Sequence, residues 1–353
     1  MRIGVAGVGR IGALHAQNLV AAVGAANVVI TDADPERARA TAAALGVASA
    51  PDVEALLAGG IDGGVDGLVV ATPTDTHAAL VLRAVAAGIP VFCEKPVAPD
   101  IASTRAVLAQ VQAAGGLVQV GFQRRFDPGY VAAHEAVASG VLGPIHTIVG
   151  QTLDPTPPPA AYVAVSGGIF RDCLVHDLDI LRWVTGQEAV EVYATGANLG
   201  DDYIRAAGDV DAVAVTLTMA DCSLAMLSAS RYNRAGYDVR MEVRGHRDSI
   251  AVGLEPRTPI RSMEPMTYPS EPAFPGFLER FGAAYAAEMA AFVSLVRSGG
   301  SSRCTVADAL AAFVLAEACE ISRRERRPVA VADIEAAGVL PGQQGRVSLE
   351  GVA

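Results

Sequence analysis

The chain of 353 residues is almost without lysine: Lys95 is the only one among its 27 basic residues, and all the others are arginine. Arginine stands wherever a generic surface cation is wanted, as happens under a strong compositional bias. It cannot lose its proton in a protein, because its pKa exceeds about 12. We therefore regard Lys95 as a candidate for a position that requires an amine able to release a proton.

A surplus of positive charge is also missing. The formal net charge is −11 at pH 7, which disfavours binding to nucleic acid or to an anionic membrane surface. The sequence holds no uninterrupted apolar stretch of about 18 residues, so we expect no membrane span. The N-terminal residues lack the basic region and cleavage site of a signal peptide, so we expect a cytoplasmic protein.

Cysteine is scarce and irregularly placed. The five cysteines form no CxxC pair, and their odd number does not suit a set of disulfides within one chain. This pattern excludes a disulfide-framed scaffold and a zinc finger, and it agrees with a reducing cytoplasm.

What the sequence does contain is enough apolar residues for a large core. Hydrophobic residues make up 51% and charged residues 18%, and the length suggests about two domains. Between residues 1 and 123, short apolar strands alternate with helical stretches. This alternation is typical of parallel βαβ units, so we predict an N-terminal Rossmann dinucleotide-binding domain of the α/β class.

Residues 124–335 have a different pattern. Extended stretches occur at residues 145–152, 189–197, 210–219, 223–230 and 239–244. They predict an α+β domain with an open, mostly antiparallel sheet; the family resemblance described below implies that this domain binds the substrate and supports oligomerisation. Two helices are predicted near 277–297 and 306–323, and the apolar stripe of the first is interpreted as ordinary core. We expect residues 336–353 to form a polar C-terminal tail.

Three glycines in GxGxxG spacing follow the first predicted strand and open a helix, within Gly7–Gly12. Gly7 permits the tight turn, Gly9 lets the backbone approach a pyrophosphate, and Gly12 lets helix and strand pack closely. The first amides of the helix supply hydrogen-bond donors and positive potential. The pattern predicts a dinucleotide site.

Asp32 stands 20 residues after Gly12, at the end of the second predicted strand. A carboxylate there accepts hydrogen bonds from both hydroxyls of the adenosine ribose and repels a 2′-phosphate, so the predicted cofactor is NAD rather than NADP. Arg37 and Arg39 follow on the next helix and are interpreted as solvated residues. The predicted cofactor contacts in this region are Gly7, Gly9, Arg10, Ile11, Gly12 and Asp32.

Lys95 lies at the carboxyl end of a predicted strand, where ligands bind in open α/β sheets. In a second polar segment, predicted helical over residues 172–185, Asp172, His176 and Asp179 are spaced i, i+4, i+7 on one face. Carboxylates accept hydrogen bonds from hydroxyls, and an imidazole takes a proton near neutral pH, so this face suits polyol chemistry. A purely structural Asp–His pair is the alternative. We expect no metal site, because no second histidine stands at ligand spacing.

Together these motifs resemble the Gfo/Idh/MocA family of oxidoreductases, over almost the whole chain to about residue 330. Within that family the similarity is greatest to members that oxidise inositol. The segments that carry the resemblance are Gly7–Gly12, Ala71-Thr72-Pro73 with His77, Glu94-Lys95-Pro96, Phe122–Tyr130, Asp154–Pro159 with Tyr162, Ser166–Phe170 leading to Asp172 and His176, and Gly208–Asp211.

The resemblance implies a role for each matching residue. The implied catalytic residues are Lys95, Asp172 and His176. The implied cofactor contacts, besides the glycine turn, are Thr72, Pro73, His77, Glu94 and Lys95. The implied polyol contacts are Lys95, Arg124, Asp154, Asp172, His176, Asp179 and Tyr237, with Arg125 and Tyr232 as alternatives to Arg124 and Tyr237. The resemblance also implies a homotetramer that associates through the sheet of the second domain.

The sequence therefore predicts an NAD-dependent oxidoreductase that oxidises a ring hydroxyl of a small cyclic polyol, with myo-inositol as the expected substrate. His176, poised by Asp172, is the candidate general base, and Lys95 would stabilise the developing alkoxide or join a proton relay. Which of Lys95 and His176 first takes the proton stays open. The alternative substrates are scyllo-inositol, an aminocyclitol and a pyranose sugar. An NAD-binding regulator without turnover is the alternative from a different class.

Overall fold

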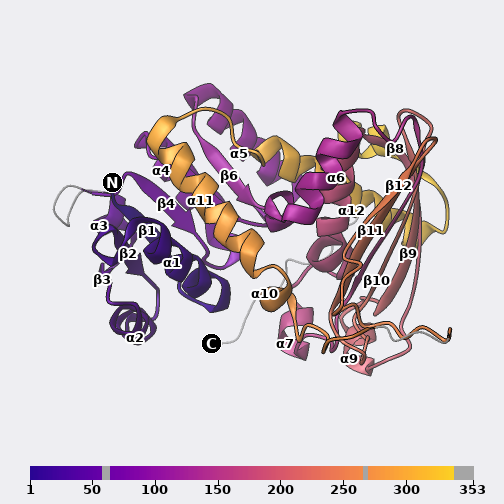
Figure 1. The fold of residues 1–353 in the computed structure, drawn as a ribbon. Helices are drawn as coiled ribbons and strands as arrows, with labels where there is room; N and C mark the ends of the chain where they lie inside the picture. Colours follow the sequence, from indigo (N-terminus) through magenta and orange to yellow (C-terminus); the bar gives the residue numbers. More distant parts are fainter. Residues whose placement is uncertain (58–63, 265–268, 338–353) are drawn as a thin grey trace, which may run out of the picture.

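The computed structural model describes residues 1–57, 64–264 and 269–337, and two sheets stand side by side in it (Figure 1). Within those residues the first sheet has six parallel strands in the order β3-β2-β1-β4-β5-β6. The strands are β1 (Ile3–Ala6), β2 (Val28–Thr31), β3 (Ala48–Ser49), β4 (Gly67–Val70), β5 (Val91–Glu94) and β6 (Val118–Gly121). The strand order reverses between β1 and β4, and the crevice at such a reversal is where open α/β sheets bind ligands.

Helices connect these strands on both faces of the sheet: α1 (Arg10–Val23), α2 (Pro35–Leu45), α3 (Val53–Leu57), α4 (Thr74–Ala86) and α5 (Ile101–Ala114). Their ends follow local chemistry. Asp34 caps the first amides of α2, Pro35 occupies its first turn, and Gly46 ends it in the left-handed conformation. Asp100 likewise caps the first turn of α5, and Gly115 ends that helix in the left-handed conformation. The Rossmann architecture predicted for this part is confirmed.

The second sheet has the order β12-β11-β7-β10-β9-β8-β13 within the described residues. Its neighbouring strands are antiparallel except for β7 and β10, so the predicted open, mostly antiparallel sheet is confirmed. The strands are β7 (Ile145–Leu153), β8 (Ala189–Ala197), β9 (Ala212–Met219), β10 (Leu224–Ser230), β11 (Asp238–Gly245), β12 (Ser249–Val252) and β13 (Val329–Ala330).

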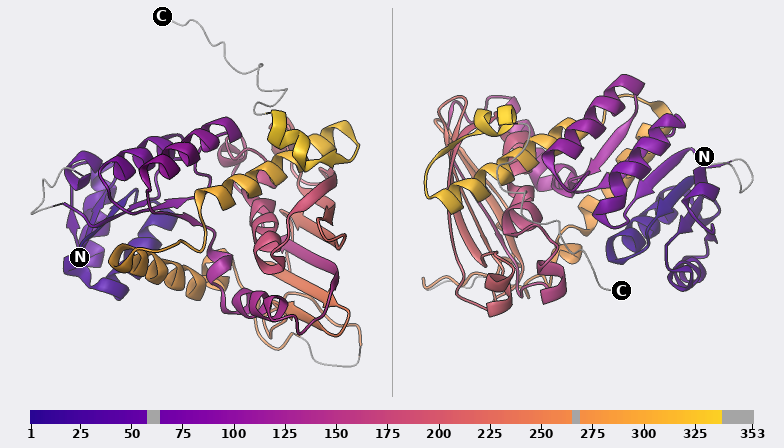
Figure 2. Two further views of the ribbon diagram at one scale, coloured as in Figure 1. Left: turned by 90° about the horizontal axis from the view of Figure 1, so that it is seen from above. Right: turned by 180° about the vertical axis from the view of Figure 1, so that it is seen from behind.

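The helices of the second part are α6 (Pro128–Ala138), α7 (Ala160–Val163), α8 (Val175–Thr185), α9 (Asp202–Ala206), α10 (Phe277–Arg280), α11 (Gly282–Ser298), α12 (Val306–Glu325) and α13 (Val331–Ala337). Of these, α6, α8 and α12 lie on the side of the second sheet that faces the first domain (Figure 2). The helix predicted to begin at residue 172 instead begins with a π turn, Phe170–Leu174, that runs into α8. Within the described residues, no helix is both long and apolar enough to cross a membrane.

The apolar stripe near 277–297 is core, as predicted, but much of it belongs to the core of the first sheet. Met289 and Phe292 of α11 are fully buried and pack in one cluster with Ile3 and Phe92. The rings of Phe92 and Phe292 meet edge to face with their centroids 6.0 Å apart. Thus α11 lies beside α1 and covers the first sheet (Figure 1). The domain boundaries at residues 123 and 335 stay a prediction, and the predicted tail falls outside the described residues from residue 338 on.

Candidate active site

The glycine turn after β1 has the geometry that a dinucleotide requires. Gly7 has φ +86°, and a Cβ there would lie 2.6 Å from the carbonyl oxygen that follows β4. A Cβ on Gly12 would lie 2.0 Å from the carbonyl oxygen of Gly7, so only glycine lets α1 pack this closely. The space in front of Gly9 is open, and no side chain caps α1. The first amides of α1, at Arg10 and Ile11, therefore border a space that fits a pyrophosphate.

Asp32 is held as an acceptor beside this turn. Its Oδ2 accepts from the backbone N–H of Val8 at 2.8 Å, and its Oδ1 accepts from the N–H of Asp34 at 2.9 Å. The Arg37 guanidinium also donates to Oδ1, at 3.1 Å, so Arg37 is more than the solvated residue expected from the sequence. A fixed carboxylate in this place suits the diol of a ribose and repels a 2′-phosphate.

His77 braces the loops that follow β4 and β5. Its ring is buried, with Nε2 2.8 Å from the carbonyl oxygen of Thr72 and Nδ1 2.8 Å from that of Pro96. Both ring nitrogens are thus engaged inside the protein, so His77 supports the cofactor loops and offers no free nitrogen to a ligand. Thr72 and Pro73 themselves stand at the carboxyl end of β4, at the strand-order reversal.

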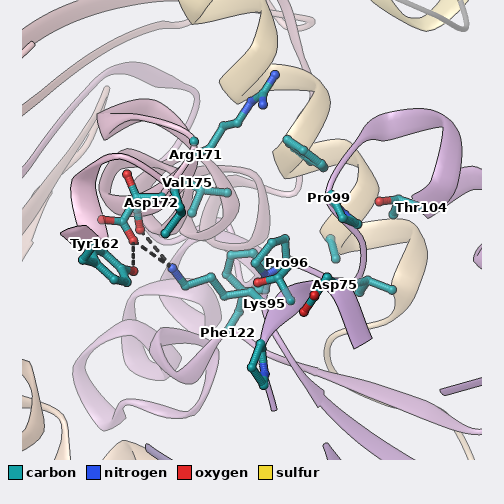
Figure 3. Close-up of a pocket in the computed structure, with 18 residues that line it drawn as sticks. Asp75, Lys95, Pro96, Pro99, Thr104, Phe122, Tyr162, Arg171, Asp172 and Val175 are labelled. Atoms are coloured by element: carbon teal, nitrogen blue, oxygen red, sulfur yellow. Dashed lines mark hydrogen bonds and ion pairs between the residues drawn. The ribbon is translucent and has the colours of Figure 1, made fainter. Parts of the chain in front are cut away.

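Lys95 emerges from the end of β5 and reaches Asp172 in the π turn (Figure 3). Its Nζ donates to the carbonyl oxygen of Asp172 at 3.0 Å and lies 3.6 Å from the carboxylate Oδ1. Tyr162 donates to the same Oδ1 at 2.8 Å. Behind Lys95, Glu94 accepts from the Lys95 backbone N–H at 3.3 Å, and its other oxygen lies 2.6 Å from Nε2 of His15.

His176 lies near Lys95, and the positive charge of Lys95 acts on its ring. Burial lowers the pKa of His176 well below its ordinary value, and the positive charges of Lys95 and Arg124 lower it further. The ring is therefore neutral near pH 7 and able to accept a proton. Its Nδ1 is buried with no hydrogen-bond partner among the described residues, and Phe122 packs edge to face on the ring at 5.6 Å.

We expected Asp172 to poise His176, and the structure shows other partners for this carboxylate. Oδ1 faces Tyr162 and Lys95, and Oδ2 accepts from Arg231 at 3.3 Å. The π turn explains the difference, because its wider winding breaks the i, i+4 relation on which the expected face depends.

Asp179 is not brought to Lys95. It is fully buried and accepts two hydrogen bonds from the Arg125 guanidinium, at 2.6 Å and 2.9 Å. The expected row of three polar residues on one face is therefore wrong in its third member, because Asp179 pairs with Arg125 of the turn after β6. Tyr232, the alternative to Tyr237 as a polyol contact, is engaged with another group: its hydroxyl donates to the Asp201 carboxylate at 2.6 Å.

Arg124 belongs to a separate buried pair. Its guanidinium donates to Asp177 at 2.9 Å and to the hydroxyl of Thr152 at 2.8 Å. Its charge acts on Tyr237, whose pKa is nevertheless raised because burial disfavours the phenolate. Arg124 and Tyr237 thus lie near one another, and both are almost inaccessible to solvent.

A cavity of about 570 Å³ opens at Lys95, Asp172 and Tyr162 (Figure 3). It is also lined by Pro73, Thr74, Asp75, Pro96, Val97, Pro99, Thr104, Phe122, Val165, Ser166, Gly167, Arg171, Val175, Ala309 and Phe313. It lies between the two domains, because its walls come from both. Over the residues described, no cluster of three or more His, Cys, Asp or Glu side chains could hold a metal ion.

Asp154 follows β7 and lies near Asp172. Burial raises the pKa of Asp154 to about 6, the charge of Asp172 adds to the rise, and Arg231 opposes it. The carboxyl of Asp154 therefore changes charge just below neutral pH.

Two residues of the site were not found from the sequence. Arg231 is one arginine among many and carries no motif that would single it out. His15 lies three residues after Gly12 on α1, within helical reach of the turn, but a lone histidine in an apolar helix gives no indication of its partner Glu94. Tyr162 was noted only as part of the family resemblance.

Comparison with known proteins agrees with the fold and with the glycine turn. The model of an oxidoreductase family with an NAD-binding Rossmann fold matches residues 1–122. The model of a Gfo/Idh/MocA C-terminal domain matches residues 130–251.

Individual relatives match over nearly their whole length. The chain is 38% identical to an inositol 2-dehydrogenase of Rhizobium meliloti, over 94% of this chain and 99% of that one. It is 34% identical to a scyllo-inositol 2-dehydrogenase (NAD(+)) of Bacillus subtilis, over 93% and 96%. A crystal structure of a myo-inositol dehydrogenase from Corynebacterium glutamicum superposes with a TM-score of 0.85 at 38% identity, covering 94% of this chain and 98% of that one.

The pKa of Asp154 predicts a pH dependence for the binding of a neutral polyol, the ligand expected from the sequence. The ionised carboxylate accepts hydrogen bonds from hydroxyls at both oxygens, and it is lost as the pH falls through about 6. We expect kcat/KM to rise with pH with a midpoint near 6, and Asp154→Asn to remove this rise. An unchanged midpoint in the Asn variant would contradict the assignment.

Proposed function

Because the chain belongs to the Gfo/Idh/MocA family of oxidoreductases, we propose that it oxidises a ring hydroxyl of a cyclic polyol with NAD. The proposed substrate is myo-inositol, converted into 2-keto-myo-inositol. The observation that carries the proposal is the meeting of Lys95 and Asp172, from two different domains, at a cavity that Pro73 and Thr74 also line, after β4. The inositol dehydrogenases that the chain resembles support the choice of substrate.

The residues fit NAD. Open space in front of Gly9 and the uncapped amides of Arg10 and Ile11 would hold the pyrophosphate, and Asp32 would hold the adenosine ribose. Thr72, Pro73 and Glu94 would border the nicotinamide half. NAD, when bound, accepts the hydride that leaves the ring carbon.

The hydroxyl proton must leave as well, and His176 is our candidate to receive it. Its lowered pKa keeps the imidazole neutral, so a nitrogen lone pair is free to take a proton. The Nδ1 of this ring is buried and has no hydrogen-bond partner among the described residues, so we assign the role of proton acceptor to Nε2. Lys95 donates a hydrogen bond to the same substrate oxygen and stabilises the negative charge that develops there.

Other side chains would hold the remaining hydroxyls. Asp154 and Tyr237 lie next to the reaction centre and supply an acceptor and a donor. Arg124 and Asp179 are assigned a supporting role, because each is buried in an ion pair of its own. We propose that they position the turn after β6 and helix α8.

We also propose that the enzyme is a homotetramer that associates through the bare face of the second sheet. Side chains along β9 alternate, with Val213, Val215 and Leu217 buried beneath the helices and their neighbours on the other face. That other face exposes apolar side chains, among them Tyr193 and Met226, around a shallow hollow.

All five cysteines are free thiols, which supports a reducing cytoplasm as the location.

A panel of polyols tests the proposed reaction. With the purified protein and NAD⁺, we expect NADH formation with the highest kcat/KM for myo-inositol, compared with scyllo-inositol, an aminocyclitol and glucose. A higher value for another member would replace the substrate. Tight NADH binding with no turnover of any polyol would instead support a regulator.

Lys95→Arg tests the role of the amine. The guanidinium keeps a positive charge but is bulkier and keeps its proton, so it fits neither the contact with Asp172 nor a proton relay. We expect kcat to fall more than tenfold, a loss above about 1.4 kcal/mol, with the Kd for NADH within twofold of wild type. A variant that keeps more than about a tenth of kcat would remove Lys95 from the mechanism.

The oligomeric state tests the sheet interface. We expect sedimentation to give the mass of a tetramer for the wild type, and a lower mass for Met226→Glu, because a charge would be buried in the interface. Leu199→Glu is the control, since Leu199 is 87% exposed in the loop after β8 and does not line the hollow, so this variant should leave the mass unchanged. A monomeric wild type would contradict the proposal.

A further inference from the structure

Arg231 is an arginine with no exposed surface. It follows β10 directly, and its backbone N–H donates to the carbonyl oxygen of Asp211 at 2.8 Å. A guanidinium removed from water is costly unless carboxylates face it. Two carboxylates face Arg231, whose guanidinium donates to Oδ2 of Asp172 at 3.3 Å and to Oδ2 of Asp209 at 3.5 Å. The side chain therefore links the reaction centre to a second carboxylate that the proposed reaction does not use.

The charged and titratable groups around Asp172 come from four elements. Lys95 faces it from the end of β5, Tyr162 from α7, Arg231 from the end of β10 and Asp154 from the end of β7. Lys95 and Tyr162 both approach Oδ1, whereas Oδ2 is held by Arg231. The guanidinium thus fixes the rotation of the carboxylate, and that rotation points Oδ1 at the Lys95 amine.

The second carboxylate extends this support to the backbone. Asp209 accepts from the N–H of Ile169 at 3.0 Å, directly before the π turn that carries Asp172. Gly168 has φ +91°, and a Cβ there would lie 3.1 Å from Asp209. Arg231 therefore secures both the Asp172 carboxylate and the start of the turn that presents it.

We propose that Arg231 is a positioning residue, which holds the Asp172 carboxylate so that Oδ1 faces the Lys95 amine during turnover. This proposal rests on the proposed function for its kinetic consequences, but the contacts that it concerns exist in the protein alone. Arg231 does not line the cavity and is not assigned to the substrate.

Arg231→Met is the direct kinetic test, because methionine fills similar space without charge. Without the guanidinium, Oδ2 loses the hydrogen bond that fixes the carboxylate, so Oδ1 can rotate away from the Lys95 amine. We expect kcat to fall more than tenfold, both in the otherwise wild-type protein and in Asp154→Asn, in which the effect of Arg231 on the pKa of Asp154 is absent. In the Asp154→Asn background the KM should change less than kcat, because Arg231 does not line the cavity.

Arg231→Lys is the conservative variant. It keeps a buried cation, and with it the fold, but a single amine cannot span both carboxylates as the guanidinium does. We expect it to restore only part of kcat. Arg240→Met is the control: it breaks an Arg–Asp pair with Asp238 in β11 and should leave kcat within twofold of wild type.

A measurement without turnover separates this proposal from the proposed function. Because Lys95 is the only lysine, reductive methylation with ¹³C-formaldehyde gives one side-chain NMR signal besides that of the N-terminus. The position of this signal reports the surroundings of the amine, so at one fixed pH it should move in Arg231→Met and move less in Arg231→Lys. An unchanged signal in Arg231→Lys, together with kcat within twofold, would overturn the proposal even if the Met variant failed to fold. A shifted signal in a protein inactive on every polyol would refute only the function.

Discussion

The contact between Lys95 and Asp172 joins two parts of the chain that belong to different sheets. Lys95 stands at the end of β5, and Asp172 stands in the turn before α8, which packs under the second sheet. The amine reaches its partner only while the two sheets keep one relative position. Helix α12 secures that position, since it packs against α5 on one side and α8 on the other. The contact between Lys95 and Asp172 therefore depends on how the two domains pack against each other.

Buried ion pairs give this docking a single geometry. The short turn that follows β6 carries Arg124 and Arg125, and these pair with Asp177 and Asp179 on α8. Each pair is almost free of solvent contact, so a shift of α8 by one residue would leave buried charges unpaired, at high cost. The two arginines thus fix the register of α8, and with it the place of His176. These charged residues position helix α8, although residues of these types alone would suggest ligand binding.

The first domain was predictable because its signals are local. Gly7–Gly12 and Asp32 lie within one βαβ unit, and strand ends in such units bring their residues together by topology. Lys95 was found because a lone lysine among arginines is visible in composition. The position of Asp172 relative to His176 was not predictable, because a π turn is set by packing and leaves no periodic signal. Arg231 escaped for another reason: its partners Asp172 and Asp209 are distant in sequence, so no spacing could join them.

The return of α11 to the first sheet has a consequence for the order in which the protein can fold. During synthesis the six strands of that sheet leave the ribosome long before α11 does, because the entire second sheet apart from β13 is made in between. Until then the surface that includes Ile3 and Phe92 lacks Met289 and Phe292 to cover it. Domains commonly fold one after another as they emerge. Here the nucleotide-binding half is the first to be translated, yet it completes its core only when the chain is nearly finished.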